Sequence, residues 1–147
     1  MGSIEEPAVQ ALLSEHRQDM YAYSPPGSVH ALSLSELAES SVTLWCAWDG
    51  HELLGCGALK ALDDSHGEIK SMRTADVHRR RGVAEALLRR IIEEARSRGY
   101  RRLSLETGSH EAFRPAQKLY GKYGFEFCGP FEPYAADPYS VFMSREI

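Results

Sequence analysis

The chain has 147 residues, of which 43% are hydrophobic and 26% are charged, and this composition is typical of a globular domain and not of a disordered chain. Its formal net charge of -4 and its pI of about 5.9 argue against a nucleic acid or an anionic membrane surface as its main partner. We therefore expect a single domain over residues 1–147, in which any bound anion is held by a local basic patch.

The cysteines, the histidines and the apolar runs exclude other classes of protein. Cys46, Cys56 and Cys128 form no close-spaced pair, which argues against a disulfide framework, and the six histidines show no metal-ligand spacing. No apolar run approaches the roughly 18 residues of a membrane helix, and segment 1–7 lacks the features of a signal peptide. We expect a cytoplasmic protein that binds no metal, and the sequence is compatible with a homodimer.

The first half of the chain changes from a helical to a strand pattern. A pattern at helical spacing, formed by Val9, Leu12, Leu13, His16 and Met20, predicts a first helix, which ends before a Pro-Pro-Gly loop. Ser35–Glu39 is predicted as a short second helix with a serine cap. Val42–Trp48 and Glu52–Leu62 are rich in β-branched or aromatic residues and are separated by an Asp-Gly turn, so they predict two antiparallel strands.

The second half predicts a strand-helix-strand unit and a closing region. Glu68–Thr74 is predicted as a strand, and an apolar stripe from Val83 predicts a long helix that ends at Gly99. Arg102–Thr107 is the next strand, followed by a helix over Ala112–Tyr123 and strands over Phe125–Cys128 and Tyr139–Ser144. The crossover is long enough to join parallel strands. We expect an α/β (α+β) fold with a mixed, mostly antiparallel sheet flanked by helices.

Two motifs that follow one another along the chain indicate a function. Arg79-Arg80-Arg81-Gly82-Val83-Ala84 opens the long helix, where backbone N–H groups, the helix dipole and guanidinium groups can face a pyrophosphate. Alone, this segment could equally be a solvated basic turn. It fits the pattern [Gln/Arg]-x-x-Gly-x-[Gly/Ala] and precedes Ala116-Gln117-Lys118-Leu119-Tyr120-Gly121-Lys122-Tyr123-Gly124-Phe125. The two blocks resemble the acetyl-CoA motif and the Ala-x-x-Leu-Tyr-x-x-x-Gly-Phe signature of the GNAT acetyltransferases, and the chain resembles their small bacterial YsnE-like branch.

The resemblance implies that acetyl-CoA is the co-substrate and that a small-molecule amine accepts the acetyl group. It also implies that the strand containing Met72, Arg73 and Thr74 aligns the pantetheine arm, and that a backbone N–H near Met72 or Arg73 stabilises the oxyanion. Tyr120 matches the family tyrosine that protonates the departing coenzyme A thiolate. The alternative for Tyr120 is a core tyrosine whose hydroxyl finds one partner.

Two glutamates are candidates for the base that removes the proton of the amine. Glu68 lies six residues before Thr74, the offset of the general-base glutamate in the histone-acetylating branch of the superfamily that the chain resembles. Glu106 lies on the neighbouring predicted strand. Either residue could instead have a structural role or lie in solvent, and we rank Glu68 first.

The acceptor site is expected to involve the first two helices, the turn between them and the last strands, where family members vary. Aromatic rings and a carboxylate suit an amine, while a basic side chain suits a substrate carboxylate. Packing in loops is the alternative for each of the candidates, which are Tyr21, Tyr23, His30, Arg73, Tyr134 and Asp137. Phe113 stands where many family members have asparagine.

A different class of function is a coenzyme-A-binding sensor that kept the fold without the chemistry. Tyr120 together with Glu68 and Glu106 favours the enzyme. The basic runs at His78–Arg81 and Arg96–Arg102 lack the interleaved aromatic residues of a single-strand nucleic-acid site. We therefore expect a small-molecule partner, with neither a nucleic acid nor a membrane.

Overall fold

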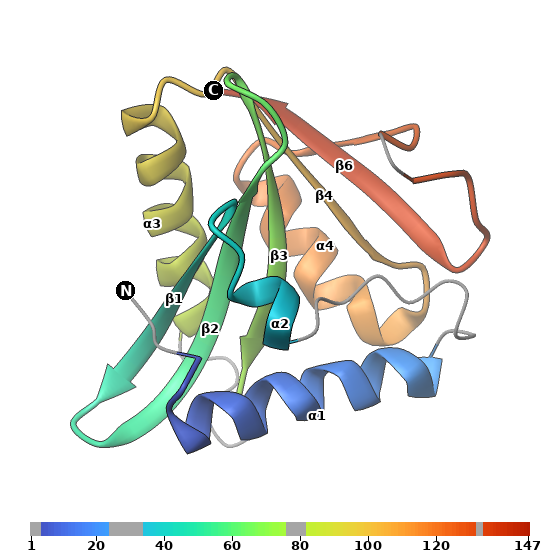
Figure 1. Ribbon diagram of the computed structural model, residues 1–147. Helices are drawn as coiled ribbons and strands as arrows, with labels where there is room; N and C mark the ends of the chain where they lie inside the picture. The colour runs from blue at the N-terminus through green and yellow to red at the C-terminus, as the bar shows by residue number, and fades with distance from the viewer. Residues whose placement is uncertain (1–3, 24–33, 76–81, 132–133) are drawn as a thin grey trace.

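The computed structural model describes residues 4–23, 34–75, 82–131 and 134–147. In these ranges the strands form one six-stranded sheet in the order β1-β2-β3-β4-β6-β5 (Figure 1). The strands are β1 (Val42–Asp49), β2 (Glu52–Ala61), β3 (His66–Thr74), β4 (Arg102–Gly108), β5 (Glu126–Cys128) and β6 (Ser140–Glu146). The helices are α1 (Pro7–Tyr23), α2 (Leu34–Leu37), α3 (Val83–Ser97), the 3₁₀ helix η3 (Glu111–Phe113) and α4 (Arg114–Lys122).

The sheet is mixed and mostly antiparallel, as the sequence predicts. Strands β1, β2 and β3 form an antiparallel meander, and β6 pairs antiparallel with both β4 and β5. Strands β3 and β4 are parallel and are joined through α3. The predicted β-α-β crossover is therefore confirmed.

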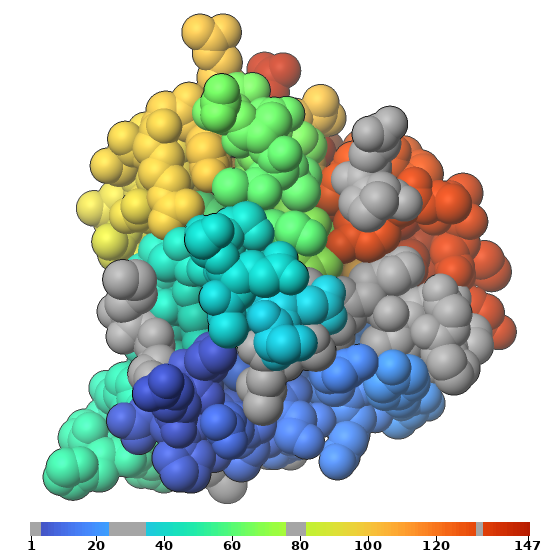
Figure 2. All heavy atoms as spheres, viewed as in Figure 1, coloured from blue at the N-terminus to red at the C-terminus, as the bar shows by residue number. Residues whose placement is uncertain are grey.

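Helices cover both faces of the sheet. Helices α3 and α4 cover one face, where Leu88 and Ile91 of α3 are fully buried in a cluster with Leu59 and Leu103 of the sheet (Figure 1). Helices α1 and α2 lie over the other face, and their atoms adjoin one another in Figure 2. Between these helices and the sheet lies a second hydrophobic cluster, which contains Val9, Leu12, Leu13, Leu37, Leu44 and Ala58. None of the helices in the described ranges is long and apolar enough to cross a membrane.

The predicted helix over Ala112–Tyr123 is wrong at its start. The structure has the short η3 there, and α4 begins only at Arg114. The cause is local, because the imidazole Nδ1 of His110 accepts a hydrogen bond from the backbone N–H of Ala112 at 3.0 Å and caps the 3₁₀ turn. Pro115 then occupies the first turn of α4, where its missing N–H costs no helical hydrogen bond.

The glycines of β2 allow a close approach to β3, as expected from their place within a strand. The ladder between the two strands shifts register beside Gly57. A Cβ on Gly57 would overlap the sulfur of Met72. A Cβ on Gly55 would lie 2.7 Å from the carbonyl oxygen of Arg73 and 3.3 Å from the Cα of Thr74. Glycine is therefore required at position 55 by the backbone of β3, whereas at position 57 a larger residue would displace the side chains of Met72 and Ile91.

We expect Gly55→Ala to lower the free energy of unfolding by about 1–3 kcal/mol, because the contacts at this position are to backbone atoms that cannot move aside. Gly121→Ala, in α4, is the matched control, since no neighbouring heavy atom lies within 4 Å of its Cβ position. That substitution should leave the free energy of unfolding unchanged or raise it by up to about 1 kcal/mol. Chemical denaturation of both variants measures the difference, and equal effects would contradict the close approach.

Candidate active site

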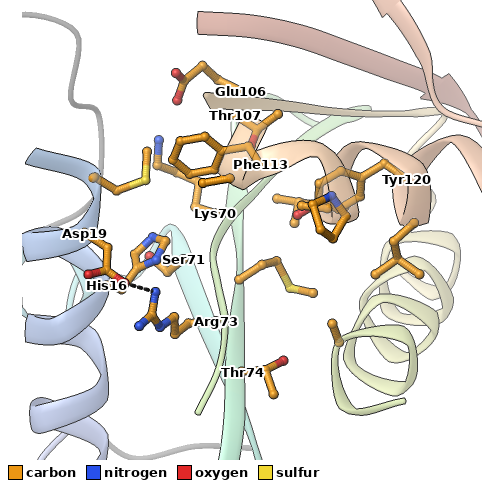
Figure 3. A pocket seen from close by; sticks show the side chains of 18 of the residues that line it. His16, Asp19, Lys70, Ser71, Arg73, Thr74, Glu106, Thr107, Phe113 and Tyr120 are labelled. Atoms are coloured by element: carbon orange, nitrogen blue, oxygen red, sulfur yellow. Dashed lines mark ion pairs between the residues drawn. The ribbon is translucent and has the colours of Figure 1, made fainter. Parts of the chain in front are cut away.

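A cavity opens where the two parallel strands separate. Strands β3 and β4 are paired only as far as Ile69 and Leu105, yet β3 continues to Thr74 and β4 to Gly108. Beyond the last pair a cavity of about 410 Å³ lies between the strands, and residues of α1, α3, η3 and α4 form its other walls (Figure 3). The cavity is at the carboxyl ends of the parallel strands, where ligands commonly bind in sheets of this kind.

One half of the cavity is formed by β3, α3 and α4. Met72 and Thr74 of β3, Ala84 of α3 and Tyr120 of α4 line this half. Gly82 precedes α3 with a φ of 79°, a conformation that L side chains rarely adopt, and nothing lies within 4 Å of the position of a Cβ. Gly82 is exposed, so a side chain at this position would meet no described neighbour, but its positive φ favours glycine.

Of the remaining residues of the predicted phosphate loop, the structure describes Val83 and not the three arginines. The side chain of Val83 is 7% exposed and packs in the core against α3 and the sheet, so only its backbone is available to a ligand. Arg79, Arg80 and Arg81 lie outside the described residues. Their contribution to a phosphate site stays a prediction.

Tyr120 reaches from α4 toward β3 and lines the cavity (Figure 3). Its side chain is 6% exposed and its ring packs edge-on against Phe125, with the ring centroids 5.9 Å apart. Burial raises the pKa of the Tyr120 hydroxyl well above its usual value, so the phenol keeps its proton at neutral pH. A protonated hydroxyl at the wall of a cavity is a hydrogen-bond donor to any ligand that enters.

Strand β3 carries a β-bulge beside the cavity. Between the paired residues Lys70 and Arg73, both Ser71 and Met72 lie opposite the single residue Gly57 of β2. Ser71 has a φ of 55°, the one positive φ of a non-glycine residue in the described ranges. Bulges interrupt the hydrogen-bonded ladder and often lie next to active sites. Ser71 and Met72 both line the cavity, so the bulge lies at its wall.

The other half of the cavity is formed by α1 and the ends of β3 and β4. His16 and Asp19 extend from α1 toward Arg73 of β3 (Figure 3). The Arg73 guanidinium pairs with the carboxylate of Asp19 at 2.6 Å and also with that of Glu15. Arg73 therefore ties α1 to β3, and a substrate carboxylate would have to compete with two carboxylates for it.

The two candidate base glutamates lie in different places. Glu106 lines the cavity, whereas Glu68 is not among the described residues that line it. Glu68 is 1% exposed, and its Oε2 accepts hydrogen bonds from the hydroxyl of Tyr134 at 2.6 Å and from Lys70 Nζ at 3.1 Å. Lys70 itself lines the cavity. Of the two glutamates, Glu106 is thus the one that lines the cavity, and Glu68 is buried and bonded to Lys70 and Tyr134. Which of them is the base stays a prediction.

The predicted acceptor residues are only partly brought together. Tyr23 and Arg73 line the cavity, but Tyr21 is 46% exposed and its ring faces the guanidinium of Arg17. His30 lies outside the described residues.

Two further predicted acceptor residues belong to the segment before β6. Tyr134 bonds to Glu68, and burial, with the negative charge of Glu68, raises the pKa of the Tyr134 hydroxyl. The carboxylate of Asp137 accepts the backbone N–H of Tyr139 at 2.8 Å. Neither residue lines the cavity. Within the described ranges no group of three or more His, Cys, Asp or Glu residues is arranged to hold a metal ion.

His16 is a site residue that sequence reasoning missed, since we used it only as one position of the helical pattern. Its imidazole lines the cavity beside Asp19. Burial, together with the positive charges of Arg73 and Lys70 and opposed by the charge of Asp19, lowers the pKa of His16 to about 4. The imidazole is therefore neutral near pH 7. A histidine within the apolar stripe of an amphipathic helix was the available signal.

His16 makes the stability of the protein depend on pH. The unfolded chain binds a proton at this residue below about pH 6.5, whereas the folded protein does so only near pH 4. Between these values the unfolded state binds more protons, so the free energy of unfolding falls with decreasing pH by up to about 1.4 kcal/mol per unit. In His16→Gln this contribution is absent. Urea denaturation from pH 7 to 4.5 should show a shallower dependence for the variant, and parallel curves would contradict a buried neutral imidazole.

Known proteins are similar to this chain in sequence and in fold. The model of the Acetyltransferase (GNAT) family matches residues 9–125. The chain is 56% identical to the uncharacterised N-acetyltransferase YsnE of Bacillus subtilis over 139 residues, which cover 95% of this chain and 92% of that protein. The crystal structure of a Klebsiella pneumoniae protein assigned as an acyl-CoA N-acyltransferase has a TM-score of 0.77 and 27% identity, covering 96% of this chain and 90% of that one. A GNAT family acetyltransferase from Elizabethkingia anophelis, crystallised with acetyl-CoA bound, has a TM-score of 0.61 and 26% identity over 74% of this chain and 78% of that one. The chain therefore belongs to the GNAT acetyltransferase family, in its YsnE-like branch, and is an acyltransferase enzyme.

Proposed function

We propose that the protein transfers the acetyl group of acetyl-CoA to the amine nitrogen of a small molecule by direct attack on the thioester. The observation that carries the proposal is the cavity between β3 and β4, because Tyr120 and the bulge residues Ser71 and Met72 line the same space. A proton donor and backbone N–H groups are what a thioester needs at its sulfur and its carbonyl oxygen. Acetyl-CoA bound to the Elizabethkingia relative supports this donor.

In this proposal the coenzyme enters along β3 and the start of α3. The pyrophosphate binds the backbone N–H groups that follow Gly82, with Arg79, Arg80 and Arg81 supplying positive charge. The pantetheine arm lies along Met72–Thr74, where β3 has left β4 and its backbone groups can bond to the amides of the arm. Ala84, which lines the cavity, leaves room for this approach.

The reaction forms a C–N bond and breaks the C–S bond. A backbone N–H near Met72 or Arg73 stabilises the oxyanion, an interaction worth a few kcal/mol in enzymes of this type. The hydroxyl of Tyr120 gives its proton to the departing thiolate. Glu106 accepts the proton of the amine, since its side chain lines the cavity and that of Glu68 does not.

Tyr120→Phe tests the proposed acid, because it removes one hydroxyl and keeps the ring. We expect turnover, measured as thiol release from acetyl-CoA with a panel of amines, to fall on the order of 10²-fold, with little change in the KM for acetyl-CoA. Tyr123→Phe is the matched control, because its hydroxyl bonds to Glu85 and Arg89 outside the cavity. Equal turnover in the two variants would make Tyr120 a core residue. Binding of acetyl-CoA without thiol release with any amine would contradict the proposed reaction.

Glu106→Gln and Glu68→Gln should differ in their effects: the first should lower turnover and the second should lower the free energy of unfolding. For Glu106→Gln we expect turnover to fall and its rise with pH on the acidic limb to weaken, because the amide keeps the shape but accepts no proton. For Glu68→Gln we expect the free energy of unfolding to fall by about 1–3 kcal/mol, because the buried Lys70 loses its charged partner. Measured pH-rate profiles and urea denaturation separate the two effects. If Glu68→Gln flattens the profile and Glu106→Gln does not, Glu68 is the base.

A further inference from the structure

An aromatic wall closes one end of the cavity. Tyr23, at the end of α1, and Phe113, in η3, both line the cavity, and their ring centroids are 5.7 Å apart with the rings nearly perpendicular. On its other side Tyr23 lies against the ring of His110 at 4.6 Å. Met20, one turn earlier on α1, adds an apolar side chain that is 7% exposed. Two segments distant in sequence thus form one apolar surface.

One side of this aromatic wall is fixed by packing. The ring of Phe113 lies directly on Gly108 at the end of β4, where any Cβ would overlap it. Gln117 donates a hydrogen bond to the carbonyl oxygen of Gly108 at 2.9 Å, and His110 is held by its bond to the N–H of Ala112. Phe113 is thus held by its packing, whereas Tyr23 is 41% exposed and packs against the rings of His110 and Phe113. A ring that is already held loses little conformational entropy when a ligand packs against it.

The charges beside the aromatic wall favour a cation. Asp19 and Glu106 line this half of the cavity, and Glu15 and Glu68 lie directly behind it on Arg73 and Lys70. Lys70 and Arg73 line the cavity as well, so this part of the described site holds four carboxylates and two cationic side chains. A positively charged amine is attracted by this arrangement, and a ligand carboxylate is repelled.

We propose that the acceptor is an arylalkylamine, a primary amine on a short chain that carries an aromatic ring and no carboxylate. The ring packs against Tyr23 and Phe113, and the amine points toward Glu106 and the thioester. This inference rests on the proposed function, because it names the acceptor of the same reaction. The ammonium group first gives one proton to Glu106, and the neutral nitrogen then forms the C–N bond as the C–S bond breaks. Coenzyme A leaves as the thiol with the proton of Tyr120, which is replaced by the second proton that the nitrogen releases.

Three acceptors of matched size test the substrate class. 2-Phenylethylamine should have a kcat/KM about three- to tenfold higher than 2-cyclohexylethylamine, which has the same chain and a saturated ring, because aromatic pairs add to the burial of area. L-Phenylalanine adds only a carboxylate to 2-phenylethylamine and should have a kcat/KM at least about tenfold lower. Equal values for the aromatic and the saturated amine, or for the amine and the amino acid, would overturn the proposal.

Substitutions in the aromatic wall locate the ring. In Tyr23→Leu and Phe113→Leu the preference for 2-phenylethylamine over 2-cyclohexylethylamine should fall to about twofold or less, with the KM for acetyl-CoA unchanged. Tyr21→Leu is the control, because the residue lies on the same helix and its ring packs on Arg17 outside the cavity. A preference that survives in both wall variants, or that is lost in Tyr21→Leu, would place the ring elsewhere.

A binding measurement separates this inference from the proposed reaction. The protein saturated with coenzyme A is titrated with 2-phenylethylamine by calorimetry. Binding by the wild type and by Tyr21→Leu, with loss of about threefold or more in Tyr23→Leu, supports the aromatic site even if no amine releases thiol. Failure of thiol release would then count against the proposed function alone. No binding of 2-phenylethylamine to the wild type would overturn the arylalkylamine proposal.

Discussion

Strands β3 and β4 pair over four residues each, His66–Ile69 with Arg102–Leu105, and then separate although both continue. Backbone groups of β3 beyond Ile69 therefore face a cavity where a parallel sheet would have another strand. Buried backbone N–H and C=O groups need hydrogen-bonding partners, and an extended ligand with amide groups can supply them. The bulge at Ser71 and Met72 and the packing of α4 keep the strands from closing this gap. The site thus follows from an interrupted strand pairing.

Helix α1 lines the half of the cavity that we propose for the acceptor, and two different interactions hold the helix against the sheet. Val9, Leu12 and Leu13 are buried against the sheet, and this burial supplies most of the stabilisation, at about 1.5–3 kcal/mol for each fully buried side chain. The ion pairs of Arg73 with Asp19 and Glu15 involve carboxylates that are more than 40% exposed, so each contributes at most about 1 kcal/mol. These ion pairs join α1 to β3 beside the cavity, which His16 and Tyr23 of the same helix also line.

The fold was predictable because its elements are encoded by local patterns. The strand pair around the Asp-Gly turn and the apolar stripe of α3 need only the periodicity of nearby residues, and both are confirmed. The start of α4 was predicted wrongly because a side-chain cap from His110 competes with helix propensity there. The site was less predictable, since the burial of Glu68 depends on Tyr134, which lies 66 residues away in sequence. Contacts of that kind leave no periodic signal, and the place of His16 in the cavity likewise depends on the partners of Arg73.

The two halves of the cavity come from different parts of the chain and share β3. The half proposed for the coenzyme is formed by β3, α3 and α4. The half proposed for the acceptor also has side chains of α1, such as His16 and Tyr23. Changes on α1 can therefore alter the acceptor without moving the groups proposed to bind the coenzyme. Phe113 lies between the halves, because it contacts Tyr23 on one side and Gly108 on the other. An asparagine, common at this position in the family that the chain resembles, would offer a polar group to the coenzyme, and a phenylalanine offers apolar surface instead. Phe113 therefore contributes to the aromatic wall that we propose for the acceptor, at a position where a polar side chain would not pack against Tyr23 in this way.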